Sequence, residues 1–201
     1  MRLIEFAIAC LLIEITPGPN MSYLTALAFG QGAKAGFQAV LGVACGLLTV
    51  GLLAATGLAQ ILSAYPVINT FLRWGGIVFM LWLAVESWMK AEAGVENESS
   101  SRLGTFWRGL TTNLLNPKLV IFYIAMLPDF VDQKSGNLFL QNVVLVLIYT
   151  GIATIIHTVL VIFAVRVRQF TNLGRNVKMV RRVMACLLLG VAAWLFMEVR
   201  P

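Results

Sequence analysis

The sequence predicts an all-α, polytopic membrane protein with six transmembrane helices, arranged as two inverted repeats of three helices each. Three observations support this class. Of the 201 residues, 59% are hydrophobic and only 12% are charged, whereas soluble domains average about 25% charged residues, and the mean hydropathy is +0.85. Six apolar stretches follow one another, each close to the roughly 20 residues that cross about 30 Å of hydrocarbon. Proline breaks interrupt the first and the fourth of these stretches.

Apolar runs and turn residues divide the chain into six segments. They are 3–26, 37–62, 67–89, 109–128, 138–165 and 179–198. A polar loop at 90–108 separates the first three from the last three, so we expect one transmembrane domain over 1–201 with halves of about 1–92 and 106–201. Because each half has an odd number of spans, the second half must be inverted relative to the first.

The first segment cannot be a continuous helix. Pro17 and Pro19 each remove a backbone donor and clash with the carbonyl four residues earlier, and Gly18 between them adds flexibility. Broken backbone persists in hydrocarbon only where it is buried in protein or lines a cavity. Thr16 and Asn20 then offer a hydroxyl and an amide beside freed carbonyls. This surface suits a small polar solute, although a structural kink alone would give the same pattern.

The second and third segments are expected to be continuous spans. Gly42 and Gly46 lie one helical turn apart in the second, and Gly75 and Gly76 are adjacent in the third. Such small residues permit close helix approach, either within the chain or between subunits, so a homo-oligomer stays open. Glu86, near the end of the third segment, is interpreted as either a gate residue or a surface charge.

The fourth segment is the least apolar and carries the second break, Asn116-Pro117-Lys118, with Asn113 one turn earlier. We expect it to cross as a discontinuous helix, because a crossing here places most of the loop lysines and arginines on one side. A charge in mid-membrane costs about 2.5–3.5 kcal/mol. Lys118 is therefore expected to bind a substrate carboxylate or to pair with Glu14, unless the segment is shallow and the lysine snorkels to the surface.

The fifth and sixth segments complete the second half, and the fifth contains the single histidine, His157. Glu14, halfway along the first segment, and His157 are the candidates for proton coupling, because both side chains change charge. The alternatives for Glu14 are a static ion pair with Lys118 or a buried protonated carboxyl, and the alternative for His157 is an interhelical hydrogen bond.

Other site types are disfavoured. Cys10, Cys45 and Cys186 lie in different apolar stretches, so neither a metal site nor a redox cofactor is expected. The net charge of +6 follows from the topology, because lysine and arginine concentrate in cytoplasmic loops, and nucleic-acid binding is not expected. The same rule puts both termini on the periplasmic side.

Matching breaks in the two halves point to a transport site near the bilayer midplane. The candidate substrate-binding residues are those of the two breaks: Thr16, Pro17, Gly18, Pro19, Asn20, Asn113, Asn116, Pro117 and Lys118.

Three motifs connect the chain with a known family. They are Thr16-Pro17-Gly18-Pro19-Asn20, then Arg73-Trp74-Gly75-Gly76 running through Leu81-Trp82-Leu83-Ala84, and finally Phe106 with Gly109, Asn113-Leu114-x-Asn116-Pro117-Lys118 and Leu127-Pro128-x-Phe130. With these motifs the chain resembles the LysE/RhtB family of amino acid exporters over essentially its whole length.

The resemblance implies a secondary transporter of the inner membrane that exports amino acids or close derivatives, driven by the proton gradient, with a site exposed alternately to the two sides. Glu14 departs from the family pattern, in which a small or apolar residue is common at this position. Two alternatives stay open. The same architecture can export another small organic solute or cation. An intramembrane enzyme is disfavoured, because Ser22 and His157 are the only deep nucleophile and base and no motif supports them.

Overall fold

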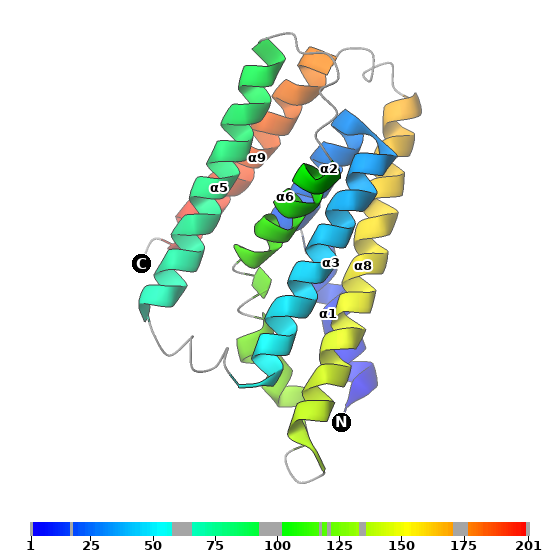
Figure 1. The fold of residues 1–201 in the computed structure, drawn as a ribbon, viewed down its shortest axis with the longest axis vertical. Helices are drawn as coiled ribbons and strands as arrows, with labels where there is room; N and C mark the ends of the chain where they lie inside the picture. Colours follow the sequence, from blue (N-terminus) through cyan, green and yellow to red (C-terminus); the bar gives the residue numbers. More distant parts are fainter. Residues whose placement is uncertain are drawn as a thin grey trace.

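The computed structural model describes residues 2–16, 18–57, 66–92, 102–116, 118–119, 122–132, 136–170 and 177–199. Within these ranges every regular element is helical, as the sequence predicts (Figure 1). The elements are α1 (Leu3–Ile15), α2 (Pro19–Gln31), α3 (Ala33–Ala55), α5 (Pro66–Glu92), α6 (Arg102–Leu114), η1 (Phe122–Met126), η2 (Leu127–Phe130), α8 (Leu138–Phe170) and α9 (Val177–Val199).

Two of the described helices have the length and polarity of membrane spans, and a bent helix pair adds a third candidate. Helices α3 and α8 are each long and apolar enough to cross a bilayer, and α1 with α2 makes a third candidate if the bent pair counts as one span. Large apolar side chains cover the outer faces, for example Ile4, Leu12, Ile155 and Val159. Since lipid is as apolar as these side chains, such exposure is typical of a membrane protein.

Several helix boundaries differ from the sequence prediction. Helix α3 ends at Ala55, before the expected residue 62, because Gly57 adopts a left-handed conformation with φ of +80° and donates its N–H to the Ala54 carbonyl. Helix α6 begins at Arg102, inside the loop that was expected to extend to residue 108. The remaining part of that loop, 93–101, lies outside the described residues.

The first break separates α1 from α2. Helix α1 ends at Ile15, and Gly18 precedes α2 in an extended conformation with φ of −158° and ψ of 179°. Pro19 is the first residue of α2, where its missing N–H and its restricted φ cost nothing. Helices α1 and α2 are bent by 58° at this point. Pro17 itself lies outside the described residues.

The second break follows α6. The last turn of α6 closes with the Leu115 N–H on the Thr111 carbonyl and the Asn116 N–H on the Asn113 carbonyl. The Asn116 side chain then accepts from the Lys118 N–H at 3.1 Å, which is the N-cap role that asparagine favours. Lys118 and Leu119 are α-helical, and the π-helix η1 and the 3₁₀-helix η2 lie further along the chain. Pro117 lies outside the described residues.

Glycines let α3 and α6 approach closely. A β-carbon on Gly42 would collide with the Phe106 carbonyl of α6, and one on Gly109 would collide with the Ala39 carbonyl of α3. A β-carbon on Gly46 would lie 2.7 Å from the Asn113 amide nitrogen. The contact that Gly42 and Gly46 permit is therefore internal to the chain.

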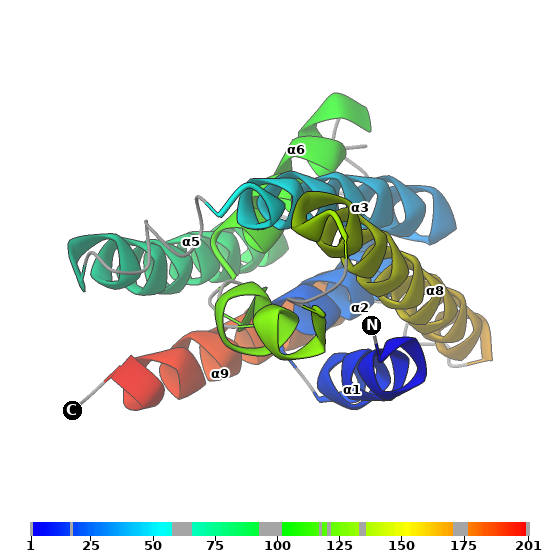
Figure 2. The ribbon, with the colours of Figure 1, turned by 90° about the horizontal axis from the view of Figure 1, so that it is seen from below.

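The remaining long helices surround α2. Helix α5 packs along α9, and α2 runs between this pair and the α3–α8 side of the molecule (Figures 1 and 2). The ends of α5 and α8 and the start of α9 lie at the same end of the molecule as the α2–α3 turn (Figure 1). Arg182 of α9 stacks there over Trp88 of α5, with 5.6 Å between the guanidinium carbon and the ring centroid.

Candidate functional site

A small pocket lies between the two helix breaks and α8. Its empty volume is about 270 Å³, a figure that includes the space at its opening to solvent. The lining combines opposite charges, amides and apolar groups. It is formed by Glu14, Gly18, Asn20, Met21, Asn113, Asn116, Lys118, Leu119, Tyr149 and His157.

An amide pair joins the two breaks across the pocket wall. The Asn20 Nδ2 of α2 donates to the Asn113 Oδ1 of α6 at 2.6 Å, and both side chains are buried. The Asn20 Oδ1 and the Asn113 Nδ2 have no hydrogen-bond partner in the described part of the chain. Because an unpaired buried polar atom costs about 1–3 kcal/mol, these two atoms are ready to bind a ligand.

Lys118 connects the second break back to the first. Its Nζ donates to the Thr16 carbonyl at 2.9 Å, immediately after the last residue of α1. The last carbonyls of a helix lack partners and carry partial negative charge, so this position favours a cation. The Thr16 hydroxyl does not face the pocket as expected, because it donates back to the Leu12 carbonyl at 3.0 Å. Thr16 thus contributes a backbone atom rather than its side chain.

The Glu14 carboxyl contacts two side chains of α8 and not Lys118. Tyr149 donates its hydroxyl to the Glu14 Oε1 at 2.6 Å, and the His157 Nε2 lies 3.2 Å from the Glu14 Oε2. The histidine contact has ion-pair distance without the alignment of a good hydrogen bond. All three side chains are buried. The carboxyl and the imidazole together form a buried pair that can share or exchange a proton.

Tyr149 was not identified as a site residue from the sequence, although its spacing from His157 places both on one face of a helix. Tyr149, Ala153, His157 and Val161 recur every four residues and are all buried, so they form one face of α8. The aromatic ring of Tyr149 also stacks on Phe122 with 4.1 Å between the centroids. Met21 and Leu119, which supply the apolar part of the lining, were not identified either.

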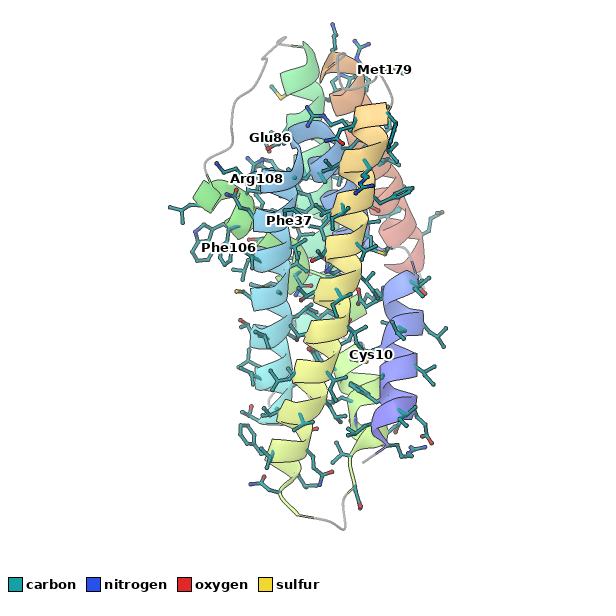
Figure 3. The ribbon with its side chains drawn as sticks, turned by 90° about the vertical axis from the view of Figure 1, so that its right-hand side faces the viewer. Cys10, Phe37, Glu86, Phe106, Arg108 and Met179 are labelled. Atoms are coloured by element: carbon teal, nitrogen blue, oxygen red, sulfur yellow. The ribbon has the colours of Figure 1, made fainter. Side chains whose placement is uncertain are left out.

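Glu86 belongs to a separate cluster. Its Oε1 lies 2.7 Å from the Arg108 Nη2 of α6, and the Arg108 guanidinium stacks over Trp82. The pair lies in the half of the molecule that contains Met179 and the start of α9 (Figure 3). Glu86 is therefore a partly buried link between α5 and α6, and not a free surface charge.

Metal-ligating clusters were not expected from the sequence. In the described ranges no group of three or more His, Cys, Asp or Glu side chains is placed to hold a metal ion. Cys10 is buried, and Cys45 and Cys186 are exposed on other helices (Cys10 is labelled in Figure 3).

Comparison with known proteins identifies the family. Residues 11–199 match the sequence profile described as LysE type translocator. The chain belongs to the LysE family. This membership confirms the resemblance found from the motifs.

Curated relatives of this LysE-family chain are leucine efflux proteins. The one from Enterobacter sp. (strain 638) is 30% identical over 139 residues, 66% of this chain and 64% of the relative. The one from Klebsiella pneumoniae subsp. pneumoniae is 27% identical over 141 residues, covering 67% and 66%. The one from Salmonella choleraesuis is 26% identical over 136 residues, covering 66% and 64%. The chain thus spans slightly less than two thirds of the length of these relatives. No solved structure matches it.

Proposed function

We propose that this LysE-family protein exports amino acids or close derivatives by proton antiport with alternating access. The observation that carries the proposal is the pocket between the two helix breaks. One small space is lined by an ammonium, a carboxyl and the unpaired Asn20 and Asn113 atoms. These groups complement both ends of a zwitterion. The names of the leucine efflux relatives support the same solute class.

The pocket offers distinct partners for the two ends of an amino acid. The substrate carboxylate would accept from Lys118 and from the Asn113 amide, which supply positive charge and a free N–H. The ammonium would donate to the Asn20 oxygen and to the Thr16 carbonyl at the end of α1. Met21 and Leu119 are the apolar groups that a neutral aliphatic side chain would contact.

Glu14 and His157 are the proposed proton-coupling groups. They lie 3.2 Å apart at the pocket, so binding of a charged substrate changes the electrostatic environment of both. Loss of a proton from this pair on one side of the membrane and its return on the other would couple the proton gradient to export.

We infer that the chain 1–201 forms one domain of six spans in two inverted repeats, placed in the inner membrane with both termini periplasmic. The two breaks in α1–α2 and after α6 support the inverted repeat, since each lies at the pocket. Basic residues at the α2–α3 turn, the end of α8 and the start of α9, among them Lys34, Arg168 and Arg182, support a cytoplasmic position for that end.

Counterflow in liposomes tests the function. Purified protein in vesicles preloaded with unlabelled leucine is expected to accumulate labelled leucine, and a panel of amino acids is expected to compete. Lys118→Ala is expected to reduce this flux at least tenfold, because the pocket loses the ammonium that would bind the substrate carboxylate. Lys34→Ala, at the start of α3, is the control and should leave the flux unchanged.

Two outcomes would contradict the proposal at different levels. Normal flux in Lys118→Ala would remove Lys118 from the substrate site. Absence of competition by every amino acid would overturn the solute class, and it would favour another small organic solute or cation on the same fold.

A further inference from the structure

Lys118 occupies a position that suits the ammonium group of an amino acid. Its Nζ donates to the Thr16 carbonyl at 2.9 Å, at the end of α1, where the helix dipole favours a positive charge. Its side chain runs past Gly18, since a β-carbon on that glycine would lie 3.6 Å from the Lys118 Cδ and 3.9 Å from its Nζ. The lysine ammonium therefore lies in the pocket wall, beside the first break.

The anchoring of Lys118 permits its side chain to move. The backbone N–H is held by the Asn116 side chain at 3.1 Å, whereas the four-carbon stem is flexible. The Lys118 side chain is held only at its ammonium, whose one hydrogen bond in the described residues goes to the Thr16 carbonyl. A different anion inside the pocket can therefore attract the Lys118 ammonium while the backbone N–H of Lys118 stays bonded to Asn116.

The neighbouring amides provide partners for both ends of such a ligand. Asn20 and Asn113 share one hydrogen bond and are 7% and 0% exposed. In either orientation of the two amides, one such bond leaves one N–H donor and one carbonyl acceptor unpaired. The donor suits a carboxylate, and the acceptor suits an ammonium.

We propose that Lys118 is an internal substitute for the substrate ammonium, which takes its place on the Thr16 carbonyl and releases it to bind the substrate carboxylate. This inference rests on the proposed function and specifies the substrate class of the same site. An amine without a carboxylate would displace Lys118 and give it no new partner. A carboxylate without an amine would draw Lys118 away and leave the Thr16 carbonyl unpaired. Only a molecule with both groups, an α-amino acid, completes the exchange.

The exchange predicts opposite effects of one substitution on two ligands. In Lys118→Met the Thr16 carbonyl is free, so leucine methyl ester, which keeps the ammonium and lacks the carboxylate, should bind at least threefold more tightly. Leucine should bind at least tenfold more weakly, because its carboxylate loses a partner. Titration calorimetry on the purified full chain measures both, with 4-methylvalerate as the ligand that has only the carboxylate. Lys34→Met is the control and should change neither affinity.

The outcomes separate this inference from the proposed function. If the wild-type protein binds neither leucine nor any other amino acid, the proposed function fails. If the wild-type protein binds leucine, but leucine methyl ester binds Lys118→Met no more tightly than it binds the wild type, the inference is wrong. The substrate ammonium then does not replace the Lys118 ammonium on the Thr16 carbonyl. Lys118→Gln, which keeps a polar tip, provides a second variant. If neither variant folds while Lys34→Met does, Lys118 is a structural cap of α1 and the inference is overturned.

Discussion

Glu14 shows how one residue acquires a role that its sequence neighbours do not indicate. Its neighbours Ile13 and Ile15 are apolar, yet Glu14 is only 5% exposed and its carboxyl contacts two polar side chains. Both partners, Tyr149 and His157, come from one face of α8. The same position is thus a buried polar contact between α1 and α8 and part of the pocket.

Removing the titratable group at Glu14 should separate coupling from binding. In Glu14→Gln, export driven by a pH gradient is expected to fall at least tenfold, because an amide cannot carry a proton. Counterflow of leucine, which needs no net proton movement, should persist at a reduced rate. Radiolabel flux with and without an imposed pH gradient measures both. Glu5→Gln, at an exposed glutamate of the same helix, should behave as wild type. Retained gradient-driven export in Glu14→Gln would exclude Glu14 from coupling.

At the scale of elements, the contact between α3 and α6 depends on the absence of side chains. Gly42 and Gly109 each face a carbonyl of the opposite helix. Backbone atoms cannot rotate out of the way as a side chain can, so these positions tolerate only glycine without a shift of the helices. Because Asn113 lies on the same helix as Gly109, the spacing of α3 and α6 also positions the pocket wall.

A pair of glycine substitutions tests this contact. Gly109→Ala should destabilise the protein by about 3 kcal/mol, the upper part of the range for overpacked sites, and should weaken leucine binding. Gly151→Ala, on α8 with open space around the position, should be neutral or stabilising by about 0.5–1 kcal/mol. Thermal unfolding in detergent gives the comparison. Equal midpoints for the two variants would contradict the close approach of α3 and α6.

Helices α5 and α6 are linked by the Glu86–Arg108 pair. The side chains are 21% and 27% exposed, so the ion pair is only partly screened by solvent. Each single charge reversal, Glu86→Arg or Arg108→Glu, should destabilise the protein by about 1–3 kcal/mol. The double variant should recover most of the loss but not all of it, because arginine then no longer stacks over Trp82.

The Arg2–Glu5 pair provides the matched control for this exchange. Its side chains are 60% and 59% exposed, and exposed pairs contribute at most about 1 kcal/mol. Glu5→Arg, which leaves the hydrogen bond from Arg2 to the Asp129 carbonyl in place, should barely change the unfolding midpoint. If the Glu86→Arg/Arg108→Glu double variant is less stable than both single variants, the pair does not link α5 with α6 through its charges.

At the scale of the whole molecule, the helices divide into two groups that meet at α2. Helix α5 packs on α9, whereas α3 packs on α6 and α8 (Figure 2). The pocket lies on the second side, where α1, α2, α6 and α8 contribute its lining. Basic residues gather at the end where α8 finishes and α9 begins. By the positive-inside rule, this asymmetry predicts that the basic end faces the cytoplasm.

A reporter at the C-terminus tests that orientation. Fusion to an enzyme active only in the periplasm should give high activity, and fusion to one active only in the cytoplasm should give none. The same reporters placed after residue 96, in the polar middle loop, should give the reverse and serve as the control. Cytoplasmic activity at the C-terminus would indicate an odd number of crossings before it or an inverted chain, and would contradict the proposed topology.

The sequence by itself determined the local features of this protein. Apolar composition predicts membrane helices, and the prolines and glycine at residues 17–19 predict the end of α1 and the start of α2, because backbone sterics act within a few residues. Asn116 and Lys118 likewise indicated the second break. Predicted helix ends were less accurate. Helix α3 ends at Ala55 rather than at the expected residue 62, because Gly57 adopts a left-handed conformation.

Only the tertiary structure decided which polar groups meet. The Asn20–Asn113 bond joins residues 93 apart in the chain, and the Tyr149–Glu14 bond joins residues 135 apart. The sequence left open whether Glu14 pairs with Lys118. In the structure Glu14 contacts Tyr149 and His157, whereas Lys118 donates to the Thr16 carbonyl. The reason is physical: composition and local sterics limit each segment alone, whereas pairing depends on how helices pack against one another and on which buried polar atoms then come within reach.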